Sequence, residues 1–232
     1  EAVLGDDLTG GLVVVKTGHS APTRCVELVE AGHPVPTQAG LDAGARVLQW
    51  AQAAGPRDLV LVLLSGGGSA LLEATAGVSL SDLQQMTAAL LACGATIGEV
   101  NCLRKHMSLL KGGQLARALY PARSITLVLS DVVGSPLDVI ASGPTVPDST
   151  TWADAWAVVE QYGLAAQLPA SVLQRLSAGL AGELPDTPKP GDRSFARSAV
   201  VIVGDNRVAA QAAASRAREL GYNTLLLSTF VE

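Results

Sequence analysis

A glycine-rich loop has the composition of a site for an anionic ligand, and its residues are Ser65, Gly66, Gly67, Gly68 and Ser69. It follows the apolar run at residues 59–64, which predicts a central strand that is buried on both faces. Glycines let the backbone approach a ligand closely, and the N–H groups and serine hydroxyls can donate to a phosphate or a carboxylate. The loop completes neither a Walker A pattern nor G-x-G-x-x-G, because Leu71 occupies the third glycine position. A tight turn with a packing role alone is the alternative.

A carboxylate follows the second strongly apolar stretch of the chain. Residues 125–129 predict a strand, and Asp131 lies just beyond its carboxyl end. Ligands of open α/β sheets bind outside the carboxyl ends of the strands, where a carboxylate can hold Mg²⁺ or orient a hydroxyl. An N-cap or turn role is the alternative for this aspartate. We favour a catalytic and metal-binding role for Asp131.

A dense set of charged and polar side chains lies within residues 97–110, which we predict to be helical, and continues to a pair of glycines. Helical spacing would place Asn101, Lys105 and Ser108 on one face, and Arg104, Ser108 and Lys111 on another. Arginine and lysine followed by a double glycine suit an anionic group, whereas a solvated charged face is the alternative. The candidate site residues of this cluster are Asn101, Arg104, Lys105, His106, Ser108, Lys111 and Gly112.

Other classes of site find little support. The histidines at positions 19 and 33 lie beside glycines and are interpreted as structural, and the three histidines and three cysteines have no zinc-ligand spacing. A net charge of −5 without a basic run argues against a nucleic-acid partner. The longest apolar run is far shorter than a membrane span, so we predict no membrane association. Three scattered cysteines and no signal peptide favour the cytoplasm.

Strands and helices alternate along the chain, which predicts an α/β fold with a mostly parallel sheet in a three-layer, Rossmann-like arrangement. Further strands are predicted at residues 12–16 and 25–30, and further helices at residues 41–54, 81–93, 151–162 and 171–180. Ser81 and Gln84 predict a capping box for the helix at 81–93. Residues 1–180 are predicted to form one α/β domain, 181–194 a linker, and 195–232 a βαβ unit with elements at 199–203, 208–220 and 224–227.

The clusters together resemble one family. Residues 59–72 read LVLVLLSGGGSALL, residues 94–116 read GATIGEVNCLRKHMSLLKGGQLA, and residues 127–148 read LVLSDVVGSPLDVIASGPTVPD. These stretches, in this order, resemble the signature of the class II glycerate 2-kinases, the MOFRL-containing glycerate kinase family. The resemblance spans nearly the whole chain.

The resemblance implies transfer of the γ-phosphoryl group of ATP, with Mg²⁺, to D-glycerate, which yields 2-phosphoglycerate. It implies a two-domain α/β kinase, and we expect Asp131, Arg104, Lys105 and Asn101 to be catalytic and the glycine loop, His106, Ser108, Lys111 and Gly112 to bind substrate or nucleotide. A homodimer is also compatible with this resemblance. The family's essential lysine and arginine motifs are expected to lie outside this chain, which would make it an inactive fragment. An NAD(P)-dependent hydroxypyruvate reductase and a non-catalytic ligand-binding fragment are the alternatives.

Overall fold

The computed structural model describes residues 1–230. Its strands are β1 (Gly11–Lys16), β2 (Val26–Ala31), β3 (Leu59–Leu64), β4 (Arg123–Leu129) and β5 (Ser198–Gly204). Its helices are α1 (Gln38–Ala53), α2 (Gly68–Leu71), α3 (Leu80–Ala92), α4 (Ile97–Met107), α5 (Gln114–Leu119), α6 (Trp152–Gln161), α7 (Ala170–Leu180) and α8 (Asn206–Glu219). None of the helices within residues 1–230 combines the length and the apolar character that crossing a bilayer would require.

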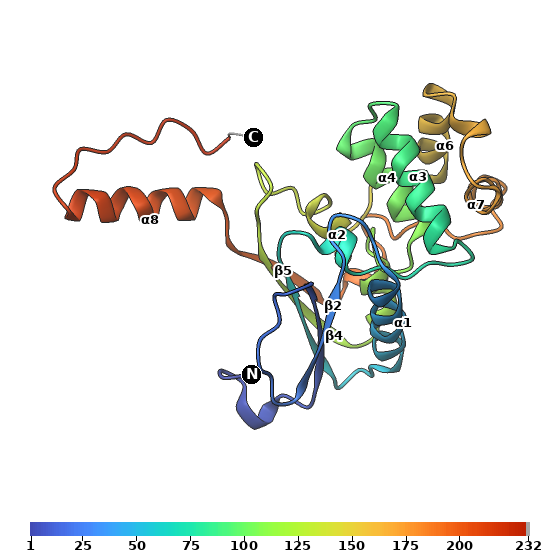
Figure 1. The fold of residues 1–232 in the computed structure, drawn as a ribbon. Coiled ribbons are helices and arrows are strands. Elements are labelled where there is room, and N and C mark those ends of the chain that lie inside the picture. The colour runs from blue at the N-terminus through green and yellow to red at the C-terminus, as the bar shows by residue number, and fades with distance from the viewer. Residues whose placement is uncertain (231–232) are drawn as a thin grey trace.

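The strands form two parallel sheets (Figure 1). Strands β3, β4 and β5 are hydrogen-bonded in that order, and β1 pairs with β2. In the larger sheet Leu59 lies opposite Arg123, and Ser124 lies opposite Ser198. The carboxyl ends of β3 and β4 therefore meet at one edge, and the predicted α/β class with a parallel sheet is confirmed.

Helices α1 and α5 cover one face of this sheet. Val60 and Val62 of β3 pack on that side against an apolar cluster that includes Ala51, Leu115 and Leu119. The prediction that residues 59–64 are buried on both faces is wrong. Leu59, Leu61 and Leu63 are 56%, 37% and 68% exposed, because the described helices cover the opposite side only.

A second apolar core joins α3, α4, α6 and α7, which stand as a group beside the sheet (Figure 1). Met86 and Leu90 of α3 pack with Leu103 of α4 and Leu176 of α7, and all four are fully buried. This core fixes the orientation of α4, the helix that carries the charged cluster.

Side chains that were not anticipated cap these helices. Helix α3 begins after Ser79, whose hydroxyl accepts from the backbone N–H of Asp82 at 3.1 Å, so the predicted Ser81–Gln84 capping box is wrong. Helix α4 has a capping box formed by Thr96 and Glu99. It ends at Met107 rather than near residue 110, since the following backbone is extended.

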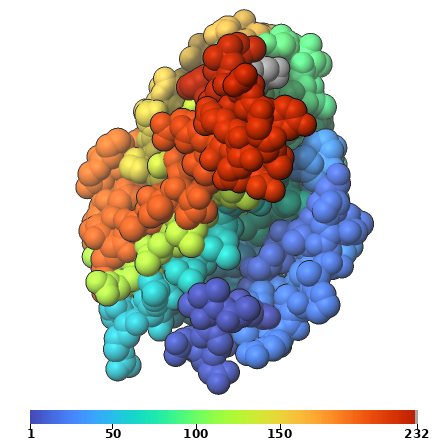
Figure 2. Space-filling view, turned by 90° about the vertical axis from the view of Figure 1, so that its left-hand side faces the viewer, coloured from blue at the N-terminus to red at the C-terminus, as the bar shows by residue number. Residues whose placement is uncertain are grey.

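The C-terminal part only partly follows the prediction. Strand β5 pairs with β4 in the larger sheet, and α8 follows it, but residues 224–227 form no strand, so the predicted βαβ unit is incomplete. Helix α8 has no buried residue and projects away from the sheet (Figure 1), and Figure 2 looks onto the side from which it projects. A strand at 224–227 would need a neighbouring strand edge to pair with, and this segment follows α8, which has no buried residue.

Candidate active site

A cavity of about 500 Å³ opens at the carboxyl ends of β3 and β4. It is lined by residues of the glycine loop, of α3 and α4, and of the loops that follow β2 and β4. The predicted site residues that it brings together are Ser65, Gly66, Gly67, Gly68, Ser69, Asn101, Arg104 and Asp131. Three segments more than twenty-five residues apart along the chain therefore meet at one cavity.

Close neighbours explain why glycines occupy this loop. A Cβ atom at Gly66 would lie 2.1 Å from Oδ2 of Asp131, and one at Gly68 would lie 2.9 Å from the Cβ of Ala141. Gly67 adopts φ +83, and a side chain there would also meet His33. Any other residue at 66 or 68 would push the loop away from Asp131 or from the segment around Ala141.

A strained turn supports the glycine loop from the opposite side. Ala141, Ser142 and Gly143 all have positive φ, of 50°, 59° and 61°. Positive φ costs a non-glycine residue about 1–3 kcal/mol and is often found at functional sites. The Ser142 hydroxyl shares a hydrogen bond of 2.9 Å with Ser69 and donates to Oδ1 of Asn101 at 3.2 Å. The turn thus ties the loop to α4.

The double glycine holds this turn in place. The backbone N–H of Gly112 donates to the carbonyl of Ser142 at 2.9 Å, and that of Gly113 donates to the carbonyl of Gly143 at 2.7 Å. Gly112 does not line the cavity, so its contribution to the site passes through the turn.

The face of α4 that meets the cavity carries Ile97, Asn101 and Arg104, which follow one another at helical spacing. The two faces predicted from the sequence are not formed, because Ser108 and Lys111 lie beyond the helix end. Burial lowers the pKa of the half-buried Arg104, while the charge of Glu73 acts in the opposite direction. Beyond the first turn, the residues on the other sides of α4 are buried in the protein.

Lys105 is one of those inward residues and is only 3% exposed. Its Nζ lies 3.1 Å from Oδ1 of Asp148, which is fully buried. Burial would raise the pKa of Asp148, but the Lys105 charge and hydrogen bonds from Thr150 and Thr187 outweigh it and lower the pKa. Lys105 therefore has a protein carboxylate as its partner and does not line the cavity.

His106 is also buried, at 1% exposure. Its Nε2 lies 3.0 Å from Oδ1 of Asp186, its Nδ1 lies 2.8 Å from the carbonyl of Cys102, and its ring lies 4.7 Å from that of Trp152. Burial alone would lower the pKa of His106, but the hydrogen bonds with Asp186 and Cys102 raise it to about 9. The segment predicted as a linker is thus anchored to α4.

This ion pair makes stability depend on pH. Because the pKa of His106 rises from 6.5 to about 9 on folding, its contribution is complete below about pH 6.5 and is lost as the pH rises to about 9. We expect His106→Gln to remove up to about 3 kcal/mol of unfolding free energy at low pH and almost none at high pH. Urea unfolding at about pH 6 and about pH 9.5 measures this. His19→Gln, at an exposed position, should keep the wild-type profile; an equal loss for His106→Gln at both pH values would contradict the expectation.

Ser108 and Lys111 meet at a second buried carboxylate, Glu73. Nζ of Lys111 forms an ion pair with Oε2 of Glu73 and donates to the carbonyl of Leu72 at 3.1 Å, and the Ser108 hydroxyl donates to Oε1. Ser108, Lys111 and Glu73 are 0%, 2% and 4% exposed. These three residues lie outside the cavity, and their contacts hold the segment before the double glycine against the segment after α2.

Two residues in or behind the cavity lining were not anticipated as functional. His33, interpreted as structural, lines the cavity beside Gly67. Ser142 was not among the candidate site residues, yet its hydroxyl joins Ser69 to Asn101. The signal for both was their place next to glycine and proline, which favour loops at the ends of strands.

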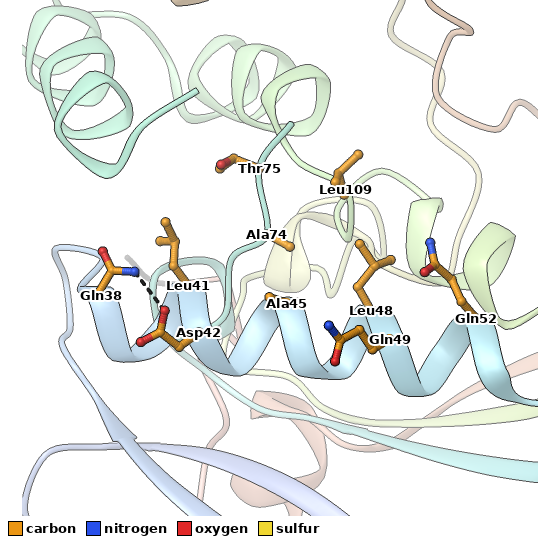
Figure 3. Close-up of a pocket in the computed structure, with 10 residues that line it drawn as sticks. All are labelled: Gln38, Leu41, Asp42, Ala45, Leu48, Gln49, Gln52, Ala74, Thr75 and Leu109. Carbon is orange, nitrogen blue, oxygen red and sulfur yellow. Dashed lines mark hydrogen bonds between the residues drawn. The ribbon is translucent and has the colours of Figure 1, made fainter. Parts of the chain in front are cut away.

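Another cavity, of about 370 Å³, lies between α1 and the segments that carry Ala74, Thr75 and Leu109 (Figure 3). Its polar residues are glutamines, Thr75 and Asp42, and Asp42 accepts a hydrogen bond of 2.8 Å from Gln38. The described residues that line it include no basic side chain, so it does not suit an anionic ligand.

Known proteins are similar to this chain in sequence and in fold. The family model described as "Domain of unknown function (DUF4147)" matches residues 1–177. A D-glycerate 2-kinase of Thermotoga maritima is 42% identical over 99% of this chain and 52% of its own length. An Agrobacterium vitis protein, provisionally named hydroxypyruvate reductase, is 43% identical over 96% of this chain and 49% of its own.

Solved structures agree with the sequence comparison. The crystal structure of a Thermotoga maritima glycerate kinase superposes with a TM-score of 0.86, at 42% identity, over 97% of this chain and 52% of that one. The chain spans about half the length of the curated relatives that it matches. It carries a DUF4147 domain and belongs to the same family as the glycerate 2-kinases.

Proposed function

We propose that the intact protein transfers the γ-phosphoryl group of ATP to the 2-hydroxyl of D-glycerate and so makes 2-phosphoglycerate. The observation that carries this proposal is the cavity at the carboxyl ends of β3 and β4, which brings the glycine loop together with Asp131, Asn101 and Arg104. Phosphoryl transfer requires positioned groups and stabilised charge rather than covalent chemistry by the protein, and this cavity provides both. The similarity to a D-glycerate 2-kinase supports glycerate as the acceptor.

Asp131 is the residue that we assign to the acceptor hydroxyl. It is exposed to the cavity beside Gly66 and can accept the proton of a hydroxyl that attacks the phosphoryl group. The backbone N–H groups and serine hydroxyls of the glycine loop would donate hydrogen bonds to anionic oxygens, which accumulate charge during transfer.

Mg²⁺ fits this site if waters and substrate phosphates complete its coordination. Within residues 1–230 no three acidic, histidine or cysteine side chains converge to form a complete metal site. Mg²⁺ commonly takes only one or two protein carboxylates and completes its coordination with waters and substrate phosphates. Asp131 would supply the protein ligand, and the bound metal would neutralise charge on the transferred group.

In this proposal the five remaining candidate residues support the site without contacting the substrates. Lys105, His106, Ser108, Lys111 and Gly112 have protein partners and lie outside the cavity. We assign them to holding α4, the strained turn and the double glycine in position. Loss of any of them would then alter the site through its geometry.

A coupled assay tests the proposal. The intact protein should consume ATP in the presence of D-glycerate, and should not oxidise NADH or NADPH with hydroxypyruvate. The reductase alternative has weaker support, because a dinucleotide pyrophosphate normally rests on the N-terminus of a full helix. Here the glycine loop leads into the four-residue α2. Nicotinamide oxidation without ATP consumption would overturn the proposal.

The glycine loop offers a second test. Gly66→Ala should lower turnover by at least about 10-fold, because its methyl group would displace the Asp131 carboxylate from 2.1 Å away. The melting temperature should change little, since both groups border the cavity. Gly55→Ala is the matched control, as its Cβ would meet only Asp58 at 3.7 Å. Wild-type turnover for Gly66→Ala would remove the close contact from the mechanism.

We place the protein in the cytoplasm because Cys25, Cys93 and Cys102 are all free thiols, including the exposed Cys25. A homodimer stays a prediction, which the mass of the intact protein in solution would test.

A further inference from the structure

The cavity has a simple charge balance. Of the basic side chains in the cluster on and after α4, Lys105, His106 and Lys111 each have a buried or half-buried carboxylate partner inside the protein. Among the described lining residues, the permanently charged side chains are Arg104 and Asp131, one of each sign. The cavity therefore offers one guanidinium to an anionic ligand.

In the described part of the chain Arg104 forms no ion pair, and the carboxylate whose charge acts on it, Glu73, is already paired with Lys111. Within residues 1–230 no acidic oxygen lies within 4.0 Å of its guanidinium, and no hydrogen bond from it is formed to another residue. The side chain is half-buried, with Ile97 and Leu91 among the other residues of the same wall. Holding a charge in such surroundings without a counterion is unfavourable, and a bound anion removes that penalty.

Asn101 adds donors next to this cation. Its Oδ1 already accepts from the Ser142 hydroxyl, which leaves its amide N–H₂ group for a ligand. Asn101 precedes Arg104 by three residues, so both side chains project from the same face of α4 into the cavity. The fork of an arginine matches the two oxygens of a carboxylate, and an amide donor can bind one of them in addition.

The number of charges separates a carboxylate from a triphosphate. A triphosphate carries several negative charges and is normally met by a lysine, a metal and other cations together. Arg104 is the one permanently cationic side chain among the described lining residues, and one guanidinium matches a ligand group that carries a single negative charge. We propose that Arg104, assisted by Asn101, binds the carboxylate of the acceptor and makes the site selective for 2-hydroxy acids over neutral polyols. This inference rests on the proposed function and assigns one of its two ligands to this wall.

The geometry gives the proposal a consequence for the reaction. A 2-hydroxy acid carries its hydroxyl on the carbon next to the carboxylate. With the carboxylate on Arg104, the hydroxyl on the neighbouring carbon lies inside the same cavity, whose lining also includes Asp131 beside Gly66. Arg104 thereby orients the acceptor as well as binding it.

Calorimetric titration of the intact protein tests this directly. The probes are D-glycerate, its uncharged amide D-glyceramide, and a non-hydrolysable ATP analogue with Mg²⁺. Arg104→Gln should weaken D-glycerate binding by roughly 10- to 100-fold and leave D-glyceramide and nucleotide binding unchanged. Arg104→Lys should give an intermediate loss, because lysine keeps the charge without the fork.

Arg123→Gln is the matched control. Arg123 is an exposed arginine at the opposite end of β4, so its loss removes the same charge far from the cavity. This variant should bind all three probes like the wild type. If Arg104→Gln does not fold, as judged by its thermal transition, Arg104→Lys takes its place in the test. The quantity compared is then the affinity for D-glycerate relative to the affinity for D-glyceramide.

Two results would overturn the inference. One is unchanged glycerate affinity in the Arg104 variants, and the other is a loss confined to the nucleotide analogue. A kinase assay on the same samples distinguishes a failure of this inference from a failure of the proposed function. If the wild type phosphorylates glycerate while the Arg104 variants bind it normally, the inference fails and the proposed function stands. If glycerate binding depends on Arg104 but ATP is never consumed, the inference stands and the proposed function fails.

Discussion

Asp131→Asn is expected to lower turnover of the proposed kinase reaction by about 10²- to 10⁴-fold. The amide keeps the size of the side chain but cannot accept the hydroxyl proton or hold a cation as a carboxylate does. The fold should not suffer, because within residues 1–230 the Asp131 side chain forms no ion pair or hydrogen bond and is exposed. Turnover is measured by the coupled assay and stability by thermal melting.

Asp42→Asn is the control for this result. Asp42 is also exposed and also an aspartate, but it lies on α1 and lines the other cavity (Figure 3). The control should retain wild-type turnover. A turnover for Asp131→Asn within about twofold of the wild type would exclude Asp131 from proton transfer and metal binding.

Lys111→Met is expected to lower the unfolding free energy by about 3–5 kcal/mol. Within residues 1–230, the substitution leaves the Glu73 carboxylate, which is 4% exposed, with hydrogen bonds from Ser108 and the backbone of Ala74 but without an ion-pair partner. A buried charge without its counterion is strongly destabilising, whereas the intact pair is nearly neutral against an apolar replacement. Urea unfolding of the variant and the wild type measures the difference.

Two further variants interpret this loss. The double variant Glu73→Gln with Lys111→Met removes both charges and should recover part of the stability, since the two residues interact directly. Arg216→Met breaks the exposed pair with Glu219 on α8 and should change stability little. A loss for Lys111→Met as small as that for Arg216→Met would show that the buried ion pair does not hold this segment.

Local patterns were sufficient for the five strands β1 to β5, the glycine loop and the aspartate, although not for residues 224–227. An apolar run followed by glycines or a polar turn is visible within about ten residues of sequence, and parallel strands place their carboxyl ends at one edge. The sequence alone therefore predicted that the loop at 65–69 and Asp131 belong together, and the cavity contains both. Which face of β3 is covered was not visible, because coverage depends on helices that come from other parts of the chain.

The partners of the charged side chains on and after α4 could not be predicted from the sequence. Arg104, Lys105 and Lys111 look equivalent along the chain, yet Lys105 pairs with Asp148, 43 residues away, and Lys111 pairs with Glu73, 38 residues away. Only Arg104 is left facing the cavity. A charge is neutralised by whatever carboxylate folding brings within a few ångströms, and that distance is set by the packing of α4 rather than by sequence separation. The sequence determined that cations would gather here, and the tertiary structure decided which one is available to a ligand.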